Sequence, residues 1–263
     1  MILILVFALI FIFSGWRLLD YYWNAPQADQ NFDKLAQIVE QAQIPTQPEG
    51  QTQPEATEPA LVEVIDPETG HSLWMLPEYA PIYTMNPHTV GWIRIDGTRI
   101  NYPVMHTPHL PDYYLKRDFE KNYSIDGCIY VREQCDVFTP SDNVTVYGHR
   151  MNSGAMFADL LKYKEEAFWA QYPYIQFDTV YGHHTYQILS VFKISAAADN
   201  GFQYHTFVDM DQAQFEEYIH QCKTRAYYDT GVTAAYGDKL ITLSTCEKGN
   251  SNMRIVVVAK RIS

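Results

Sequence analysis

The stretch from Lys239 to Lys260 most strongly restricts what this chain can fold into. Two strand-like runs, 240–246 and 254–259, flank a polar break that contains Gly249. The first run alternates apolar and small polar residues, which is the period of a strand with one buried face. The second is β-branched and apolar, as a buried strand is. Because the residues between them favour turns, the stretch predicts a β-hairpin.

Cys246 ends the first run and Arg254 begins the second, so the hairpin would set the guanidinium near the thiol. Since successive side chains alternate, Cys246 shares its face with Ser244 and Thr242. Reactive thiols lie in electropositive, partly exposed places, and the pair is therefore a candidate nucleophile with a fixed cation. The alternative is a buried, inert Cys246 and a solvated arginine at a strand end.

The composition suits one domain with a β-rich aromatic core. The 263 residues include 20 Tyr and 13 Phe, and only 19% are charged. Many short strand-like segments with few helices favour a closed β-barrel or a β-sandwich. The net charge of −12 argues against nucleic acid as a partner. Four cysteines make no disulfide framework at this length, although Cys128 and Cys135 could pair if a hairpin brought them together.

Residues 1–23 are expected to form a transmembrane anchor. The run from Ile2 to Phe13 is unbroken and apolar. At about 1.5 Å per residue, Ile2 to Leu19 spans roughly 27 Å, close to the hydrocarbon core of a bilayer. Aromatic residues at 21–23 suit the membrane interface. Because the basic region and cleavage site of a signal peptide are missing, we predict an uncleaved anchor, whose orientation the flanking charges do not fix.

Residues 24–63 are expected to connect this anchor to the globular domain. An amphipathic helix over 31–43 carries Phe32, Leu35 and Val39 at helical spacing and should lie on the domain. The segment 44–63 is rich in Pro, Gln, Thr and Glu and predicts a spacer.

The globular domain, 64–263, alternates short strands with a few helical segments. A turn at Asp96-Gly97 is expected to join its first two strands. Besides the C-terminal hairpin, the predicted strands are 91–95, 100–105, 127–132, 143–147, 174–180 and 184–194, and the predicted helical segments are 77–85, 155–163, 165–171 and 211–225. The last of these helices is predicted to have one apolar face, with Phe215, Tyr218, Ile219 and Cys222.

His149 stands out among the nine histidines because it follows a strand and a glycine, and so ends a strand as Cys246 does. A Cys–His pair requires proximity in space and not in sequence. The alternative for a single histidine is an ordinary surface or core residue. The sequence contains no Cys-x-x-Cys, His-Glu-x-x-His or Gly-rich phosphate loop, so we expect no metal and no other cofactor.

Four sequence blocks, in the same order, resemble the class B sortases, which are cysteine transpeptidases that attach proteins to the Gram-positive cell wall. The resemblance covers about residues 80 to 263. The blocks are Gly91-Trp92-Ile93-Arg94-Ile95 with Asn101-Tyr102-Pro103-Val104, Tyr114-Leu115-Lys116-Arg117-Asp118-Phe119, Tyr147-Gly148-His149 with Met156-Phe157-Ala158-Asp159-Leu160, and Thr242-Leu243-Ser244-Thr245-Cys246 with Arg254-Ile255-Val256-Val257-Val258-Ala259-Lys260.

The resemblance implies a mainly β fold, a closed eight-stranded β-barrel with flanking helices, preceded by the membrane anchor helix. It implies that Cys246 forms an acyl-thioester, that Arg254 holds the oxyanion and that His149 is the general acid and base. The substrate would be an Asn-Pro-x-Thr type sorting signal of a secreted protein, and the acceptor an amine of a cell-wall peptide. The catalytic domain would then lie on the extracellular face of the cell membrane.

The resemblance also implies substrate contacts for Leu115, Ser244 and Glu247, while Tyr204 comes from a region that matches only loosely. Three other functions stay open on the sequence. The first is a cysteine hydrolase that uses water as its acceptor, and the second is a sortase that polymerises pilins through a lysine. The third is a membrane-tethered binding domain without catalysis.

Overall fold

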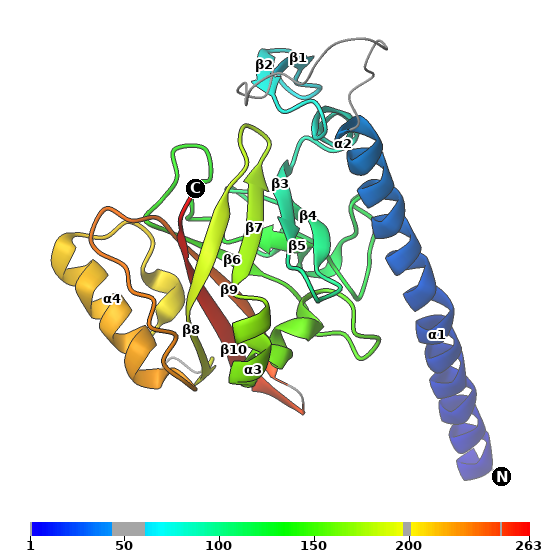
Figure 1. The fold of residues 1–263 in the computed structure, drawn as a ribbon. Helices are drawn as coiled ribbons and strands as arrows, with labels where there is room; N and C mark the ends of the chain where they lie inside the picture. The colour runs from blue at the N-terminus through cyan, green and yellow to red at the C-terminus, as the bar shows by residue number, and fades with distance from the viewer. Residues whose placement is uncertain (1, 44–60, 197–200, 248) are drawn as a thin grey trace.

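The computed structural model describes residues 2–43, 61–196, 201–247 and 249–263. Eight strands form a closed barrel (Figure 1), so the sandwich alternative is excluded. The strands are β3 Thr89–Arg94, β4 Asn101–Met105, β5 Ile129–Val131, β6 Asn143–Tyr147, β7 Tyr174–Thr179, β8 Thr185–Ser195, β9 Leu240–Glu247 and β10 Asn250–Arg261. Their order around the barrel is β10-β8-β7-β3-β4-β5-β6-β9.

Local turn chemistry explains the hairpins of the barrel. The predicted turn at Asp96-Gly97 joins β3 to β4, and Gly97 has φ +72°, which favours glycine. The hairpins β7–β8 and β9–β10 are antiparallel, as predicted. Closure of the barrel depends on two parallel pairs, β4 with β5 and β6 with β9, which join segments far apart in sequence.

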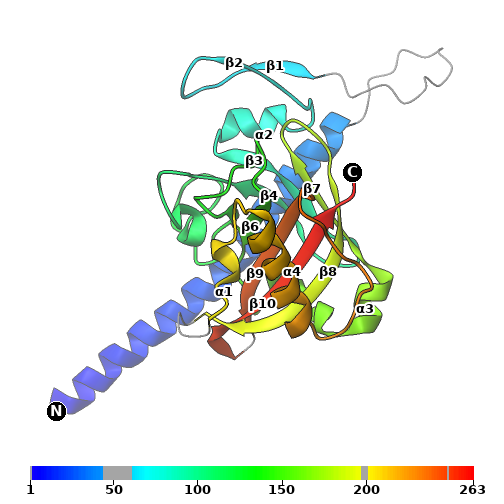
Figure 2. The same ribbon diagram turned by 90° about the vertical axis from the view of Figure 1, so that its left-hand side faces the viewer.

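Buried hydrophobic residues form two clusters, of which the first fills the barrel interior and continues outside it to Phe32, Leu35 and Val39. The interior contains Ile93, Val146 and Leu243. The outer cluster lies under α4 Gln212–Arg225, which packs outside β8 (Figure 2). The face of α4 predicted to be buried is buried; its residues are Phe215, Tyr218, Ile219 and Cys222.

Cys128 and Cys135 are free thiols in the structure, and both are buried in the first cluster. The pairing that the sequence left open is therefore absent from the described structure. The Cys135 thiol instead bonds backbone groups of the neighbouring strand, since it donates to the Asn143 carbonyl and accepts from the Thr145 N–H.

The remaining helical segments are short. The predicted segment 77–85 is helical as α2 Ala80–Met85, and 165–171 as α3 Glu166–Gln171. The segment 155–163 is a 3-10 helix, η2 Phe157–Lys164, instead of an α-helix. Two further 3-10 turns, η1 Tyr113–Lys116 and η4 Tyr204–Thr206, lie in connections between strands.

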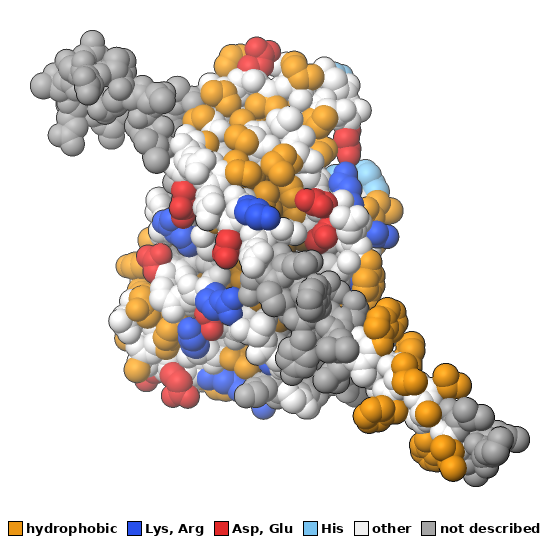
Figure 3. Space-filling view, turned by 90° about the vertical axis from the view of Figure 1, so that its right-hand side faces the viewer, with side chains coloured by type: hydrophobic (Ala, Val, Ile, Leu, Met, Phe, Trp, Pro, Cys, Tyr) orange, Lys and Arg blue, Asp and Glu red, His pale blue; other side chains and the backbone are white. Residues whose placement is uncertain are grey.

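The N-terminal helix α1, Ile2–Gln43, is one element without a break between its two predicted parts. Phe32, Leu35 and Val39 are buried, and α1 contacts α2 and β4, which confirms that this part lies on the domain. The described side chains of residues 4–16 are largely exposed and apolar (Figure 3). No described helix is long and apolar enough to cross a membrane, so the anchor stays a prediction.

The expected spacer lies largely outside the described residues, which resume at residue 61. Its last two positions belong to β1 Val62–Ile65, which pairs with β2 Ser72–Met75 in a small separate hairpin (Figure 2). Sequence analysis missed this hairpin because its strands are mostly exposed and lack the alternation of a half-buried strand.

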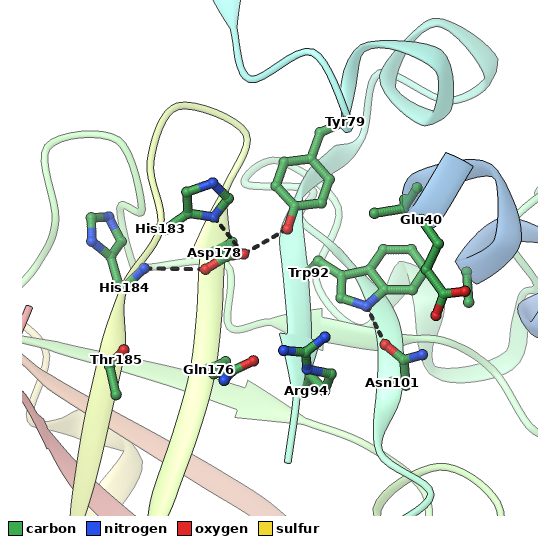
Figure 4. A pocket seen from close by; sticks show the side chains of 12 residues that line it. Glu40, Tyr79, Trp92, Arg94, Asn101, Gln176, Asp178, His183, His184 and Thr185 are labelled. Atoms are coloured by element: carbon green, nitrogen blue, oxygen red, sulfur yellow. Dashed lines mark hydrogen bonds and ion pairs between the residues drawn. The ribbon is translucent and has the colours of Figure 1, made fainter. Parts of the chain in front are cut away.

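A polar network on the outside of the barrel ties α2 to the β7–β8 hairpin (Figure 4). The Tyr79 hydroxyl donates to Asp178 Oδ2 at 2.6 Å, and His183 Nδ1 donates to the same oxygen at 2.8 Å. His183 Nε2 lies 3.1 Å from a carboxylate oxygen of Glu78. The network borders a cavity of about 280 Å³ between α1 and the sheet. Because its central groups bond one another, we interpret it as structural.

Candidate active site

A groove of about 490 Å³ opens where β6 and β9 end and β10 begins. Both candidate chemical groups from the C-terminal hairpin, Cys246 and Arg254, line it. His149 lines it as well, so the structure brings together all three residues that the sequence singled out for catalysis. Cys246 is a free, half-buried thiol and is therefore open to a ligand in the groove.

The strand register positions the three side chains. In the β9–β10 ladder Cys246 is directly opposite Arg254, as predicted from the hairpin. On the other side of β9, Tyr147 of β6 pairs with Ser244 in parallel register. His149 follows Tyr147 by two residues, and Cys246 follows Ser244 by two residues. Both therefore lie at the same end of the barrel.

The backbone around His149 is tied to β9. The Gly148 N–H donates to the Ser244 carbonyl at 3.2 Å, and the Thr245 hydroxyl donates to the Gly148 carbonyl at 2.8 Å. A β-carbon at Gly148 would overlap Phe157 and Ile129, so the close packing at this strand end requires glycine.

His149 Nε2 donates to the Leu115 carbonyl at 2.7 Å. Because a carbonyl only accepts, the neutral ring carries its proton on Nε2, and Nδ1 is left as the basic nitrogen. This hydrogen bond fixes both the tautomer and the orientation of the ring. His149 can therefore accept or return a proton at Nδ1 while Nε2 stays bonded to η1.

The half-buried Arg254 side chain provides a permanent positive charge in the groove. Its Nη1 donates to the Met253 carbonyl at 3.3 Å. A guanidinium presents several donors in one plane, so Arg254 can hold a backbone contact and still donate toward an oxygen in the groove. A thiol, an imidazole and a guanidinium around one groove can carry out acyl transfer through a thioester.

Three of the four predicted substrate contacts line the groove: Leu115, Tyr204 and Ser244. The Tyr204 hydroxyl and the Ser244 hydroxyl are 2.7 Å apart and hydrogen-bonded in a buried position. Burial raises the pKa of Tyr204, so its hydroxyl stays neutral. The fourth, Glu247, is not among the described lining residues; its carboxylate pairs with Lys164 and Lys193 instead.

The sortase domain family matches residues 93–262 of the chain. The chain belongs to the sortase family. Similar proteins include sortase B of Staphylococcus aureus, which is 28% identical over 261 residues, covering 98% of this chain and 94% of the relative. Sortase B of Listeria monocytogenes is 27% identical over 257 residues, covering 97% and 93%. These relatives place the chain with the class B sortases.

The solved structure of a Staphylococcus aureus sortase B–substrate complex has a TM-score of 0.72 and 25% identity, covering 92% of this chain and 99% of that one. The eight-stranded barrel with its helices is thus the sortase fold. Sortases are cysteine transpeptidases that anchor surface proteins, so this sortase is an enzyme and the alternative of a non-catalytic binding domain is excluded.

Sequence reasoning missed part of the wall of the sortase groove. Arg132 follows β5, and its Nη1 donates to the His205 carbonyl at 2.5 Å, which ties the two sides of the groove together. Local sequence patterns do not predict that Arg132 and His205 line a groove, because the two residues lie in separate connections that meet only in the folded chain. The additional lining residues include Asp112, Tyr130, Arg132, Glu133, Gln203 and His205.

Proposed function

We propose that Cys246 attacks the threonine carbonyl of an Asn-Pro-x-Thr type sorting signal in a secreted protein and passes the acyl group to a cell-wall amine. The observation that carries this proposal is the convergence of Cys246, Arg254 and His149 on one groove from adjacent strands. The choice of signal is supported by the class B relatives.

In the first half-reaction, the proton of the Cys246 thiol passes to Nδ1 of His149, the resulting thiolate forms a bond to the carbonyl carbon, and the carbonyl oxygen becomes an oxyanion. Arg254 stabilises that oxyanion by donating hydrogen bonds that strengthen as charge develops. When the tetrahedral intermediate collapses, the C–N bond breaks and protonated His149 gives its Nδ1 proton to the leaving amine. The product is an acyl-thioester and a released C-terminal peptide.

In the second half-reaction, neutral His149 takes a proton from the incoming amine, which attacks the thioester carbon. The C–S bond breaks and the Cys246 thiolate is regenerated. Leu115, Ser244 and Tyr204 form the part of the groove that would hold the signal. Glu247 was also predicted to contact the substrate, but its carboxylate pairs with Lys164 and Lys193, and the proposal gives it no contact with the signal.

The proposal includes attachment to the cell membrane through residues 1–23, with the catalytic domain on the extracellular face. The apolar run of the sequence and the exposed apolar residues of α1 support the anchor. Secreted substrates and cell-wall acceptors require the extracellular face. The predicted partners are thus the sorting signal, the wall amine and the bilayer, with no cofactor.

The test incubates the full chain, purified in detergent, with a fluorogenic Asn-Pro-x-Thr peptide library, with and without triglycine. We expect cleavage after threonine, a triglycine adduct by mass spectrometry, and loss of both in Cys246→Ala. Cleavage with water as the only acceptor would support the hydrolase alternative. An adduct only with a lysine-containing pilin peptide would support pilin polymerisation. Turnover that survives in Cys246→Ala would refute the assigned nucleophile.

A further inference from the structure

Glu247 directly follows Cys246, but strand alternation points its side chain away from the groove. The side chain is only 12% exposed. Each carboxylate oxygen is paired with one ammonium group: Lys164 Nζ lies 2.7 Å from Oε1 and Lys193 Nζ lies 3.2 Å from Oε2. Because Lys164 ends η2 and Lys193 lies in β8, this one carboxylate joins three elements.

The β9–β10 ladder becomes irregular just beyond the pair of Cys246 and Arg254. The register is regular from Leu240 to Cys246, and after a shift Glu247 pairs with Asn250 among the residues that the structure describes. Pairing between β9 and β10 is therefore regular up to the candidate catalytic pair and irregular beyond it, while on the other side of β10 Met253 still pairs with Ser195 of β8. The two ion pairs of Glu247 add a side-chain anchor at the point where the ladder weakens.

The geometry of this cluster makes it stronger than an isolated surface ion pair, which contributes little. The Glu247 side chain is partly buried, while Lys164 and Lys193 are 33% and 43% exposed, so the added strength comes from two lysines that share one carboxylate. Hydrogen bonds from the two lysines lower the pKa of Glu247, with Lys164 as the larger cause. The carboxylate therefore remains ionised, and the cluster intact, at neutral pH.

We propose that Glu247, Lys164 and Lys193 form a positioning cluster, which holds the end of the β9–β10 hairpin so that Cys246 and Arg254 keep their relative placement. This inference rests on the proposed function, which assigns the thiol as nucleophile and the guanidinium as oxyanion donor. Glu247 acts through its neighbours and does not touch the substrate. A shift of the hairpin end would misalign the attacking thiol with the oxyanion donor, and small misplacements of reacting groups are costly.

The experiment measures transpeptidation of an Asn-Pro-x-Thr peptide to triglycine by the full chain and its Glu247→Gln, Lys164→Gln and Lys193→Gln variants. We expect Glu247→Gln to lower kcat about tenfold, with KM within about twofold, because alignment is lost and substrate binding is not. In the Glu247→Gln background, the lysine substitutions should cause no further loss, since all three residues act as one unit. Glu247→Asp should recover part of kcat.

Lys239→Gln is the matched control, since it removes a comparable pair with Asp142, at 2.9 Å, near the opposite end of β9. Its kcat should equal that of the unmodified chain. A raised KM with unchanged kcat in Glu247→Gln, together with silent lysine variants, would overturn the cluster and make Glu247 a substrate contact. An equal loss in Lys239→Gln would overturn it in favour of a general stability effect. Failure of the proposed function is separate, because it would appear in the unmodified chain as a missing triglycine adduct, or as turnover that survives in Cys246→Ala, whatever the Glu247 variants do.

Discussion

Two of the functional groups in the groove contact the backbone. His149 is oriented by the Leu115 carbonyl, and Arg254 donates to the Met253 carbonyl. The chemistry therefore depends on the identity of each side chain, because a thiol, an imidazole and a guanidinium have different roles in acyl transfer. At this scale, substitutions should change rates and not the fold.

Arg254→Lys should lower kcat about 100-fold with little change in KM, because an ammonium is a point charge and does not replace a planar fork of donors. Steady-state transpeptidation with a sorting-signal peptide measures this. Arg261→Lys is the control: it changes the same residue type near the far end of β10, and its rate should be unchanged. Near-normal turnover of Arg254→Lys would show that Arg254 does not stabilise the oxyanion.

Secondary-structure elements deliver these groups to the groove and hold them there. The parallel pairing of β6 with β9 places His149 beside Cys246, and the antiparallel pairing of β10 places Arg254 there from the other side. Helix α4 supports this sheet from outside, and its start carries a capping box between Asp211 and Gln214. Substitutions at this scale separate positioning from stability.

Gly148→Ala should disturb the end of β6, since the added carbon would overlap Phe157 and Ile129. We expect a stability loss of about 1–3 kcal/mol from overpacking and a fall in kcat of about tenfold as His149 moves. Denaturant unfolding and kinetics measure the two effects. Gly182→Ala is the control, because its nearest contact would be 3.4 Å and it should be tolerated. Full activity in Gly148→Ala would contradict the link between this packing and the histidine.

Asp211→Ala removes the side chain that accepts from the Gln214 N–H at the start of α4. The stability should fall by about 1 kcal/mol, the usual cost of a lost N-cap, while kcat stays unchanged because α4 does not line the groove. Thermal unfolding and the transpeptidation assay check both parts. Gln212→Ala, one position further on, is the comparison that should cost less. A change in kcat would mean that α4 affects the groove.

The molecule consists of a barrel, an N-terminal helix packed on it and a small hairpin, and contacts between residues far apart in sequence connect these parts. The network of Tyr79, Asp178, His183 and Glu78 is one of these joints. Hydrogen bonds that His183 donates to the Asp178 and Glu78 carboxylates raise the pKa of this histidine to about 10. The charged histidine therefore stabilises the folded chain as a whole and not the groove.

The stability that His183 contributes should depend on pH. A histidine whose folded pKa is raised contributes fully below its unfolded pKa of about 6.5 and loses that contribution as pH rises toward 10. Because the side chain is 48% exposed, solvent screening limits the effect to about 1 kcal/mol or less. The free-energy difference between the unmodified chain and His183→Gln, measured by denaturant unfolding from pH 6 to 10, should fall with pH. A difference for His183→Gln that does not change with pH would contradict the prediction.

The sequence by itself determined the local elements and the facing of Cys246 and Arg254. Strand alternation and turn residues are properties of neighbouring positions, so a hairpin between residues 240 and 259 can be derived without knowing the rest of the chain. The same holds for the buried face of α4 and the docking face of α1. The position of His149 at a strand end made it a candidate, and the resemblance of the motif blocks to the class B sortases assigned it to the catalytic site.

Only the tertiary structure decided what surrounds these residues. The partners of Glu247 come from η2 and β8, and the groove wall at Arg132 and His205 comes from connections that meet after barrel closure. The parallel pairing of β6 with β9 could not be predicted from a turn motif, because the two strands are far apart in sequence and no short turn connects them. The physical reason is that local patterns show which face of a segment is buried, whereas its neighbours depend on the packing of the whole chain.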